Sequence, residues 1–265
     1  MLVSGRRSLY LRAGCRRVGV GWHFNITKTE AKKLARGKVR PSAYRRGLEA
    51  QAARLYAREP VRFHRPLEDF QVLLTILKWD SKRMVFLRKG SEYLAYMILK
   101  IGQSKERKNI GRMSEYAGSR SALASCLNEV ISRYELDELN FTVPEYDEDF
   151  LTGLSNLGLK GKKDFLLGHT IKIINFSRLM RAMLPYIEAR IGKEAASAMG
   201  YGKDDKGFYI SFRRGRFVLG DEESLLNFVF GVPGRRTVLP KSQQLARILK
   251  RIFPLPLVVP GLNYV

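Results

Sequence analysis

Three strand-like runs follow one another between Arg83 and Gly118, and this succession restricts the possible folds more than any other feature of the sequence. The first two runs are separated by Lys89-Gly90, a dipeptide typical of a tight turn, so they predict an antiparallel hairpin. The third run ends at Gly118, directly before a segment with helical periodicity. The middle of the chain is therefore expected to contain a β-sheet, built from RMVFLRK, EYLAYMILKIG and IGRMSEYAG.

Segments with helical signals lie on both sides of these strands. Ser42 is a candidate N-cap for a helix that runs to Glu59, and the basic segment that ends at Pro41 is expected to be a linker. Pro66 suits the first turn of a second helix, which reaches Trp79. A further helix, a strand and a short helix are predicted over 119–134, 138–144 and 145–159. This order of elements predicts one α/β domain.

A second unit is expected to begin near Lys160, where Lys160–Asp164 forms a charged, glycine-containing joint. One helix of this unit is expected to kink at Pro185, and residues 207–220 predict a hairpin that turns at Arg214-Gly215. The predicted elements are a strand over 169–176 and helices over 177–192, 221–231 and 241–253. The last twelve residues contain three prolines, which predict an extended tail.

Basic residues are concentrated at the two ends of the chain. The 265 residues include 48 Lys and Arg and 25 Asp and Glu, which gives a net charge of +23. Residues 1–60 hold 15 basic and 3 acidic residues, residues 61–160 hold 15 and 14, and residues 161–265 hold 18 and 8. Such an excess fits a surface for polyanions or for an anionic phosphate ligand, and equally a basic face that meets an acidic partner.

Composition excludes several classes of protein. The 45% hydrophobic content argues against wholesale disorder, and no run of about 18 apolar residues is present, as a membrane-spanning helix requires. Two cysteines, Cys15 and Cys126, cannot form a disulfide framework and favour a reduced, cytoplasmic setting. Because the three histidines and two cysteines lie far apart in sequence, no metal site is expected.

Sequence motifs of the common enzyme classes are absent: there is no Walker A, HExxH or GxSxG, and no GxGxxG after a strand. The acidic cluster Asp147–Asp149 could hold a hard metal ion, but it is more typical of the first turn of a helix. Glu115 lies at a strand end and is either a catalytic carboxylate or a structural one, with neither favoured. Basic turns at Arg213–Arg216 and Gly234–Arg236 leave nucleic-acid binding as a weak alternative.

Segments that resemble one acetyltransferase family occur in a fixed order. SLYLRAGCRRVGVGWHFNI resembles the last helix and final strands of a GNAT acetyltransferase domain, with Cys15 where phenylalanine is usual. Residues 36–159 resemble a second GNAT-like domain, through AARLYAREPVRFHRPLEDFQVLL, EYLAYMILKI, MSEYAGSRSAL and NFTVPEYD. Residues 160–265 resemble a sterol-carrier-protein-like domain, through TIKIINFSRLMRAMLPYIEARI, GFYISF, LLNFVFG and RIFPLPLVVPGLNYV. The order is similar to the enhanced intracellular survival family of bacterial acetyltransferases.

This resemblance implies an α/β fold: a GNAT-like mixed sheet with flanking helices, followed by a sterol-carrier-protein-like α/β domain. It makes residues 1–35 the tail of a truncated first GNAT domain, whose glycine-rich loop would hold the pyrophosphate of acetyl-CoA at a helix N-terminus. No such loop is found in this sequence. Acetyl-CoA is therefore expected as cosubstrate of the complete enzyme and not as a ligand of this chain. Residues 1–35 are expected to dock on the second GNAT-like domain or to remain poorly ordered.

The resemblance also implies two catalytic groups. The tyrosine of the family's L-Y motif corresponds to Tyr10, which as general acid would protonate the departing thiolate. The terminal carboxylate of the family corresponds to that of Val265, which as general base would take a proton from the amine. The alternative for Tyr10 is a packing tyrosine at a helix end, and for Val265 a frayed terminus.

The function that we expect is that of the C-terminal portion of a GNAT-type N-acetyltransferase, which transfers acetyl from acetyl-CoA to a primary amine and is inactive alone. The implied partners are the amine substrate and either a second copy of the chain or an upstream GNAT domain. The alternative function is a non-enzymatic module that binds an apolar ligand or a partner protein. A closed apolar cavity within residues 160–265 would favour that alternative.

Overall fold

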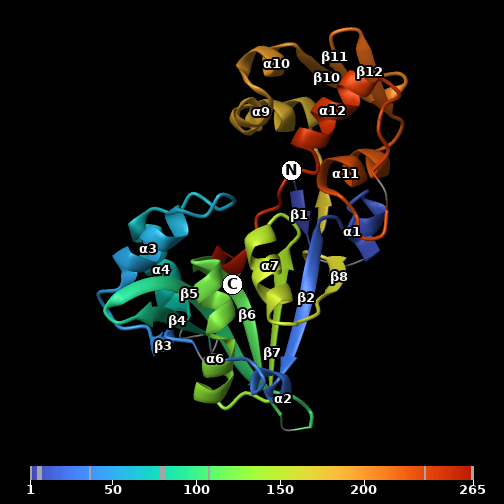
Figure 1. Ribbon diagram of the computed structural model, residues 1–265. Helices are drawn as coiled ribbons and strands as arrows, with labels where there is room; N and C mark the ends of the chain where they lie inside the picture. The colour runs from blue at the N-terminus through green and yellow to red at the C-terminus, as the bar shows by residue number, and fades with distance from the viewer. Residues whose placement is uncertain are drawn as a thin grey trace. The chain divides into compact units, whose positions relative to one another are not determined.

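A computed structural model describes residues 2–4, 8–35, 37–77, 82–106, 108–235 and 237–263. The chain forms two compact units (Figure 1). Unit 1 comprises Met1–Val20 and Phe165–Leu257, and unit 2 comprises Gly21–Asp164 and Val258–Val265. The division into domains 1–35, 36–159 and 160–265 stays a prediction. Among the described helices, none combines the length and the apolar character needed to span a bilayer.

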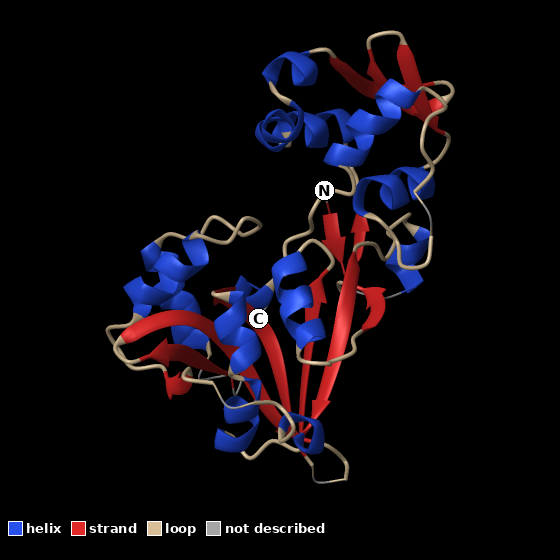
Figure 2. Cartoon of the chain, viewed as in Figure 1, coloured by secondary structure: helices blue, strands red, loops and turns tan. Residues whose placement is uncertain are grey.

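Unit 2 is built on a mixed sheet of seven strands in the order β3-β4-β5-β6-β7-β2-β8, which are labelled in Figure 1 and drawn in red in Figure 2. The strands β6 and β7 run parallel, whereas the β3–β4, β4–β5, β5–β6 and β2–β7 pairs are antiparallel. The predicted hairpin at Lys89-Gly90 is confirmed. In chain order the strands are β2 (Val20–Thr27), β3 (Arg40–Ala43), β4 (Lys82–Lys89), β5 (Glu92–Gln103), β6 (Asn109–Gly118), β7 (Glu138–Pro144) and β8 (Lys162–Phe165).

Alternate residues of the central strands supply two separate cores, one on each face of the sheet. In β4, Val85 and Leu87 face one core, while Met84 and Phe86 face the other. The first core packs on the helices α5 (Arg120–Ser125), α6 (Leu127–Arg133) and α7 (Glu148–Asn156). The second packs on α3 (Glu49–Ala57) and α4 (Leu67–Ile76). The short helix α2 (Lys28–Ala31) follows β2.

The strands β6 and β7 share only a short ladder, in which Ile110–Met113 pair with Glu138–Phe141. Directly beyond this ladder the register between β5 and β6 shifts, so that Ser114 forms a bulge. The strand β2 pairs with β7 from Gly21 to Thr27. This part of residues 1–35 therefore docks on the sheet, which is one of the two outcomes expected for residues 1–35. The end of β6 beyond the bulge carries the candidate site described below.

Unit 1 contains a three-stranded antiparallel sheet, β10-β11-β12, packed against helices. The predicted hairpin is confirmed as β11 and β12, but its turn is Arg213-Arg214, one residue before the predicted Arg214-Gly215. Phe208, Ile210 and Phe212 of β11 are buried as its alternation predicts. The described elements are β1 (Leu2–Ser4), α1 (Ser8–Arg12), β9 (Thr170–Lys172), α8 (Phe176–Ala182), α9 (Leu184–Ile191), α10 (Lys193–Ser197), β10 (Met199–Asp204), β11 (Gly207–Phe212), β12 (Gly215–Leu219), α11 (Glu222–Phe230) and α12 (Gln243–Ile252).

Two predicted connections are strands in the structure. The expected linker and helix start around Pro41 and Ser42 form the edge strand β3, and α3 begins only at Glu49. An edge strand tolerates proline because one side of it needs no N–H donor. The expected joint Lys160–Asp164 mostly forms β8, whose lysines suit a sheet edge.

Two predicted helices are each interrupted. Residues 119–134 form α5 and α6, which meet at Cys126. Residues 177–192 are divided at Met183, so that Pro185 lies in the first turn of α9, where its missing N–H costs no hydrogen bond. The tail is extended as predicted, apart from a single 3₁₀ turn, η1, over Gly261–Asn263.

Candidate functional site

Glu115 is the central residue of a buried polar cluster at the end of β6. Its side chain is only 7% exposed and faces α3 and α4. The Arg65 guanidinium donates two hydrogen bonds to it, of 3.0 Å to Oε1 and 3.1 Å to Oε2. The Tyr96 hydroxyl on the neighbouring strand donates a third, of 2.7 Å, to Oε1. Such bidentate Arg–carboxylate pairing is among the stronger side-chain interactions in proteins.

Arg65 comes from the segment between α3 and α4 and lies in an aromatic pocket. Its guanidinium carbon is 3.9 Å from the ring centroid of Tyr56 and 5.0 Å from that of Phe70. Burial lowers the pKa of Arg65, but hydrogen bonds and the charge of Glu115 outweigh this, so the net shift is upward. Burial, together with the charge of Glu115, raises the pKa of Tyr96 well above its usual range. Both groups are therefore held in their ordinary protonation states, cationic and neutral.

The C-terminal tail completes this cluster. The backbone N–H of Leu262 donates a 2.8 Å hydrogen bond to Oε2 of Glu115. Arg65 donates a further hydrogen bond to the side-chain oxygen of Asn263. Leu262 is 2% exposed and belongs to the same apolar cluster as Tyr96. Glu115 is thus a satisfied structural carboxylate, because four donors already occupy its oxygens.

A second ionic cluster lies where β6 continues into α5. The Arg120 guanidinium bonds Glu59 at 2.6 and 2.9 Å and Asp147 at 3.0 Å. The Tyr116 hydroxyl donates a 2.8 Å hydrogen bond to Asp147. Asp147 also accepts from the Phe150 N–H as N-cap of α7, so the acidic cluster Asp147–Asp149 does form the start of a helix. Burial lowers the pKa of Arg120, but bonds to the two carboxylates raise it overall.

The backbone N–H groups of Gly118, Ser119 and Ala122, at this strand-to-helix connection, already have acceptors within the protein. The Gly118 N–H donates 2.8 Å to the carboxylate of Glu59, and the Ser119 side chain accepts from the Ala122 N–H. In phosphate-binding loops, such N–H groups are free and meet an anionic oxygen. Here the carboxylate of Glu59 takes the place of an external anion. The residues at this position therefore do not fit the pyrophosphate of acetyl-CoA.

Of the two predicted catalytic residues, one lies among the described residues. Tyr10 lies in α1 of unit 1, where it is half-buried. Val265 lies outside the described residues. Their roles as acid and base stay predictions. Among the described residues, no group of three or more His, Cys, Asp or Glu side chains is arranged to hold a metal ion.

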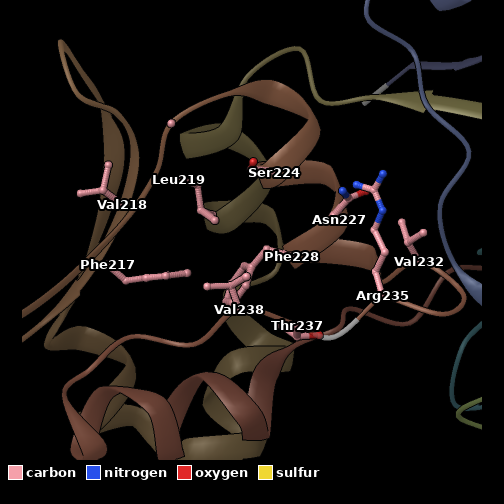
Figure 3. Close-up of a pocket in the computed structure, with 11 residues that line it drawn as sticks. Phe217, Val218, Leu219, Ser224, Asn227, Phe228, Val232, Arg235, Thr237 and Val238 are labelled. Atoms are coloured by element: carbon pink, nitrogen blue, oxygen red, sulfur yellow. The ribbon is translucent and has the colours of Figure 1, made fainter.

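A separate hollow of about 310 Å³ lies within unit 1, between β12, α11 and the segment that follows α11 (Figure 3). Its apolar wall includes Phe217, Phe228 and Val238, and Asn227 and Arg235 add polar groups. Val238 is 70% exposed, so the hollow is open to solvent on that side. The sequence predicted a loop here but did not predict a hollow.

Sequence reasoning singled out Glu115 but missed its partners Arg65, Tyr96 and Asn263. The signal that was available is a glutamate and a tyrosine at buried positions of adjacent strands, because a buried charge requires a partner. The identity of that partner could not be read from spacing, since Arg65 is 50 residues from Glu115 and Asn263 is 198 residues from Arg65.

No protein-family profile matches the sequence, and no curated protein matches it. Among solved structures, the GCN5-related N-acetyltransferase from Anabaena variabilis matches with a TM-score of 0.52 at 12% identity, over 86% of this chain and 62% of that protein. A conserved Enterococcus faecalis protein described as a probable N-acyltransferase gives a TM-score of 0.47 at 11% identity. The match covers 65% of this chain and 44% of the Enterococcus protein. The chain thus has a mixed α/β fold like that of GNAT proteins and spans about 62% of the Anabaena protein.

Proposed function

We propose that this chain is the C-terminal portion of a GNAT-type N-acetyltransferase that transfers acetyl from acetyl-CoA to a primary amine. The observation that carries the proposal is the GNAT-like fold, which covers 86% of the chain in the comparison with the Anabaena enzyme. In unit 2, the backbone and cationic donors where β6 meets α5 are already bound to Glu59 and Asp147. The proposal therefore assigns acetyl-CoA to a separate GNAT domain, of which residues 1–35 form the last part.

In this proposal, two groups of the chain act on protons. The terminal carboxylate of Val265 accepts a proton from the amine, so that the amine nitrogen can attack the thioester carbonyl. As the carbon–sulfur bond breaks, the Tyr10 phenol donates its proton to the departing thiolate. The family resemblance supports both roles. The docking of the tail in unit 2 through Leu262, three residues before its end, further supports the role of Val265. Alone, the chain is expected to be inactive or nearly so.

Isothermal titration of the purified chain with acetyl-CoA tests the proposal. We expect no binding heat and no thermal stabilisation, because the donors that would meet the pyrophosphate are satisfied internally. Adenosine triphosphate serves as the control, since a chain with a net charge of +23 attracts any polyphosphate. Micromolar binding of acetyl-CoA that exceeds binding of the control would contradict the proposal and place a coenzyme site in this chain.

The hollow in unit 1 gives a second candidate function, the binding of a small apolar ligand, although the hollow is open and is not the closed cavity that this alternative calls for. Its wall combines apolar side chains with Asn227 and Arg235, a combination typical of small-molecule sites. The probe is oleate, whose carboxylate would compete with Glu223 for Arg235. We expect Val238→Asp to weaken oleate binding about tenfold or more, because a charge would replace part of the apolar wall.

Val72→Asp provides the matched control for this test. Val72 is 60% exposed, close to the 70% of Val238, but lies on α4 of unit 2. Binding of oleate that is equally weak in both variants, or that is unmeasurable in the wild type, would exclude the hollow as the ligand site.

A further inference from the structure

We propose that Arg65 and Glu115 form a positioning clamp for the C-terminal tail of the chain itself. This inference rests on the proposed role of Val265, because the clamp fixes the tail two residues before the terminal carboxylate. Arg65 and Glu115 are positioning residues and take no part in the chemistry. The clamp holds the η1 turn between β6 and α4 within unit 2.

The tail donates and accepts hydrogen bonds where the buried pair needs them. Arg65 and Tyr96 satisfy Oε1 of Glu115, while Oε2 receives Arg65 and the Leu262 N–H. The side-chain oxygen of Asn263 accepts a hydrogen bond from Nη2 of Arg65, the same nitrogen that bonds Oε2 of Glu115. A buried ion pair repays the cost of its desolvation only when such additional hydrogen bonds are made. The tail therefore supplies bonds that the pair would otherwise lack.

Packing gives the tail a second attachment. Leu262 is 2% exposed and joins the apolar cluster formed by Tyr56, Phe70, Tyr96 and their neighbours. Full burial of a leucine side chain contributes favourably to the free energy of docking. The turn itself is closed by a 2.9 Å hydrogen bond from the Asn263 N–H to the Pro260 carbonyl. Leu262 thus anchors a turn that is already closed internally.

Gly261 is the residue that permits this arrangement. Its φ of 53° is in the left-handed region, where a side chain is strained. A Cβ atom at this position would overlap Oε2 of Glu115 and lie 2.9 Å from its Cδ. A side chain at position 261 is therefore incompatible with the clamp, although Arg65 and Glu115 themselves remain unchanged.

Hydrogen–deuterium exchange of the tail peptide tests the clamp. In the wild type we expect slow exchange, and in Gly261→Ala exchange about tenfold faster or more, because the docked turn opens. The control is Gly90→Ala, at a similar φ of 61° in the same unit, where a Cβ would meet nothing within 4 Å. This control carries the same backbone strain without the collision, so its tail should exchange as slowly as in the wild type.

Asn263→Ala provides a milder second variant, since Asn263 is exposed and its loss removes only the bond to Arg65. We expect exchange between that of the wild type and that of Gly261→Ala. Equal tail exchange in the wild type, Gly261→Ala and Gly90→Ala would overturn the clamp. Because the measurement needs neither acetyl-CoA nor turnover, its failure is distinct from failure of the acetyltransferase proposal.

Discussion

The buried hydroxyl of Tyr96 makes the stability of the fold depend on pH. It is fully buried on β5 and donates to Glu115, so an ionised phenolate would lose its hydration and face a carboxylate. Both effects raise its pKa well above the usual value, with burial the larger. In the unfolded chain a tyrosine ionises near pH 10 (about 10 in model peptides). The neutral phenol therefore stabilises the fold fully below that pH, and this stability is lost as the pH rises above it.

This coupling predicts the alkaline behaviour of Tyr96→Phe. At pH 8 the variant should be less stable than the wild type by about 1 kcal/mol or more, because the hydrogen bond to Glu115 is lost. Above pH 10 the difference in the free energy of unfolding between the wild type and the variant should narrow by up to about 1.4 kcal/mol per pH unit. The reason is that only the wild type loses stability through ionisation of this phenol. Urea unfolding between pH 8 and 11.5 measures both free energies. A difference that stays constant over this range would contradict the assignment.

At the scale of elements, Arg120 joins three parts of unit 2. It is the first residue of α5, and it bonds Glu59 just beyond α3 and the N-cap Asp147 of α7. All three side chains are largely buried. Because its two carboxylate partners come from different elements, this one guanidinium fixes the position of both relative to the end of β6. The same contacts occupy the donors that an anionic ligand would need.

We predict that Arg120→Met lowers the free energy of unfolding by about 3–5 kcal/mol, because it leaves two buried carboxylates without their cation. Lys163→Met is the matched control, since it removes a cation from an exposed pair with Glu145. That change should cost only about 0–1 kcal/mol. Chemical denaturation of both variants provides the comparison. Equal losses in the two variants would show that the Arg120 cluster contributes no more than a surface pair.

At the scale of the whole molecule, the chain consists of two compact units with separate cores. Leu154 is buried in unit 2, within the core on α7, and Leu249 is buried in unit 1, on α12. Each unit encloses apolar side chains of its own. The two units can therefore unfold in two separate transitions.

Calorimetry of two core variants tests this division. Leu154→Ala and Leu249→Ala should each cost about 2–5 kcal/mol in the unit that contains the cavity. We expect two thermal transitions in the wild type. Leu154→Ala should lower the midpoint temperature of the transition of unit 2, and Leu249→Ala that of unit 1. If both variants shift one common transition by similar amounts, the two units unfold together and the predicted independence is wrong.

The sequence by itself determined most of the regular elements. The two hairpins, the helix after residue 220 and the extended tail follow from neighbouring residues, because turns and periodicity depend on contacts within a few positions. The α/β class was likewise expected from the order of these elements, and the GNAT-like fold was implied by the family resemblance. The break at Cys126 was not predicted, whereas the kink expected at Pro185 is a break two residues earlier, at Met183.

Which residues meet depends on how the chain folds back on itself. Arg40–Ala43 became a strand because β4 offers it an edge, and β-structure depends on a partner more than on local preference. Arg65, Glu115 and Leu262 are brought together from three distant segments by the sheet and the returning tail. A buried charge must find its counter-charge wherever the topology supplies one. The sequence therefore identified Glu115 as a candidate, and the fold alone showed that its oxygens bind the chain's own tail.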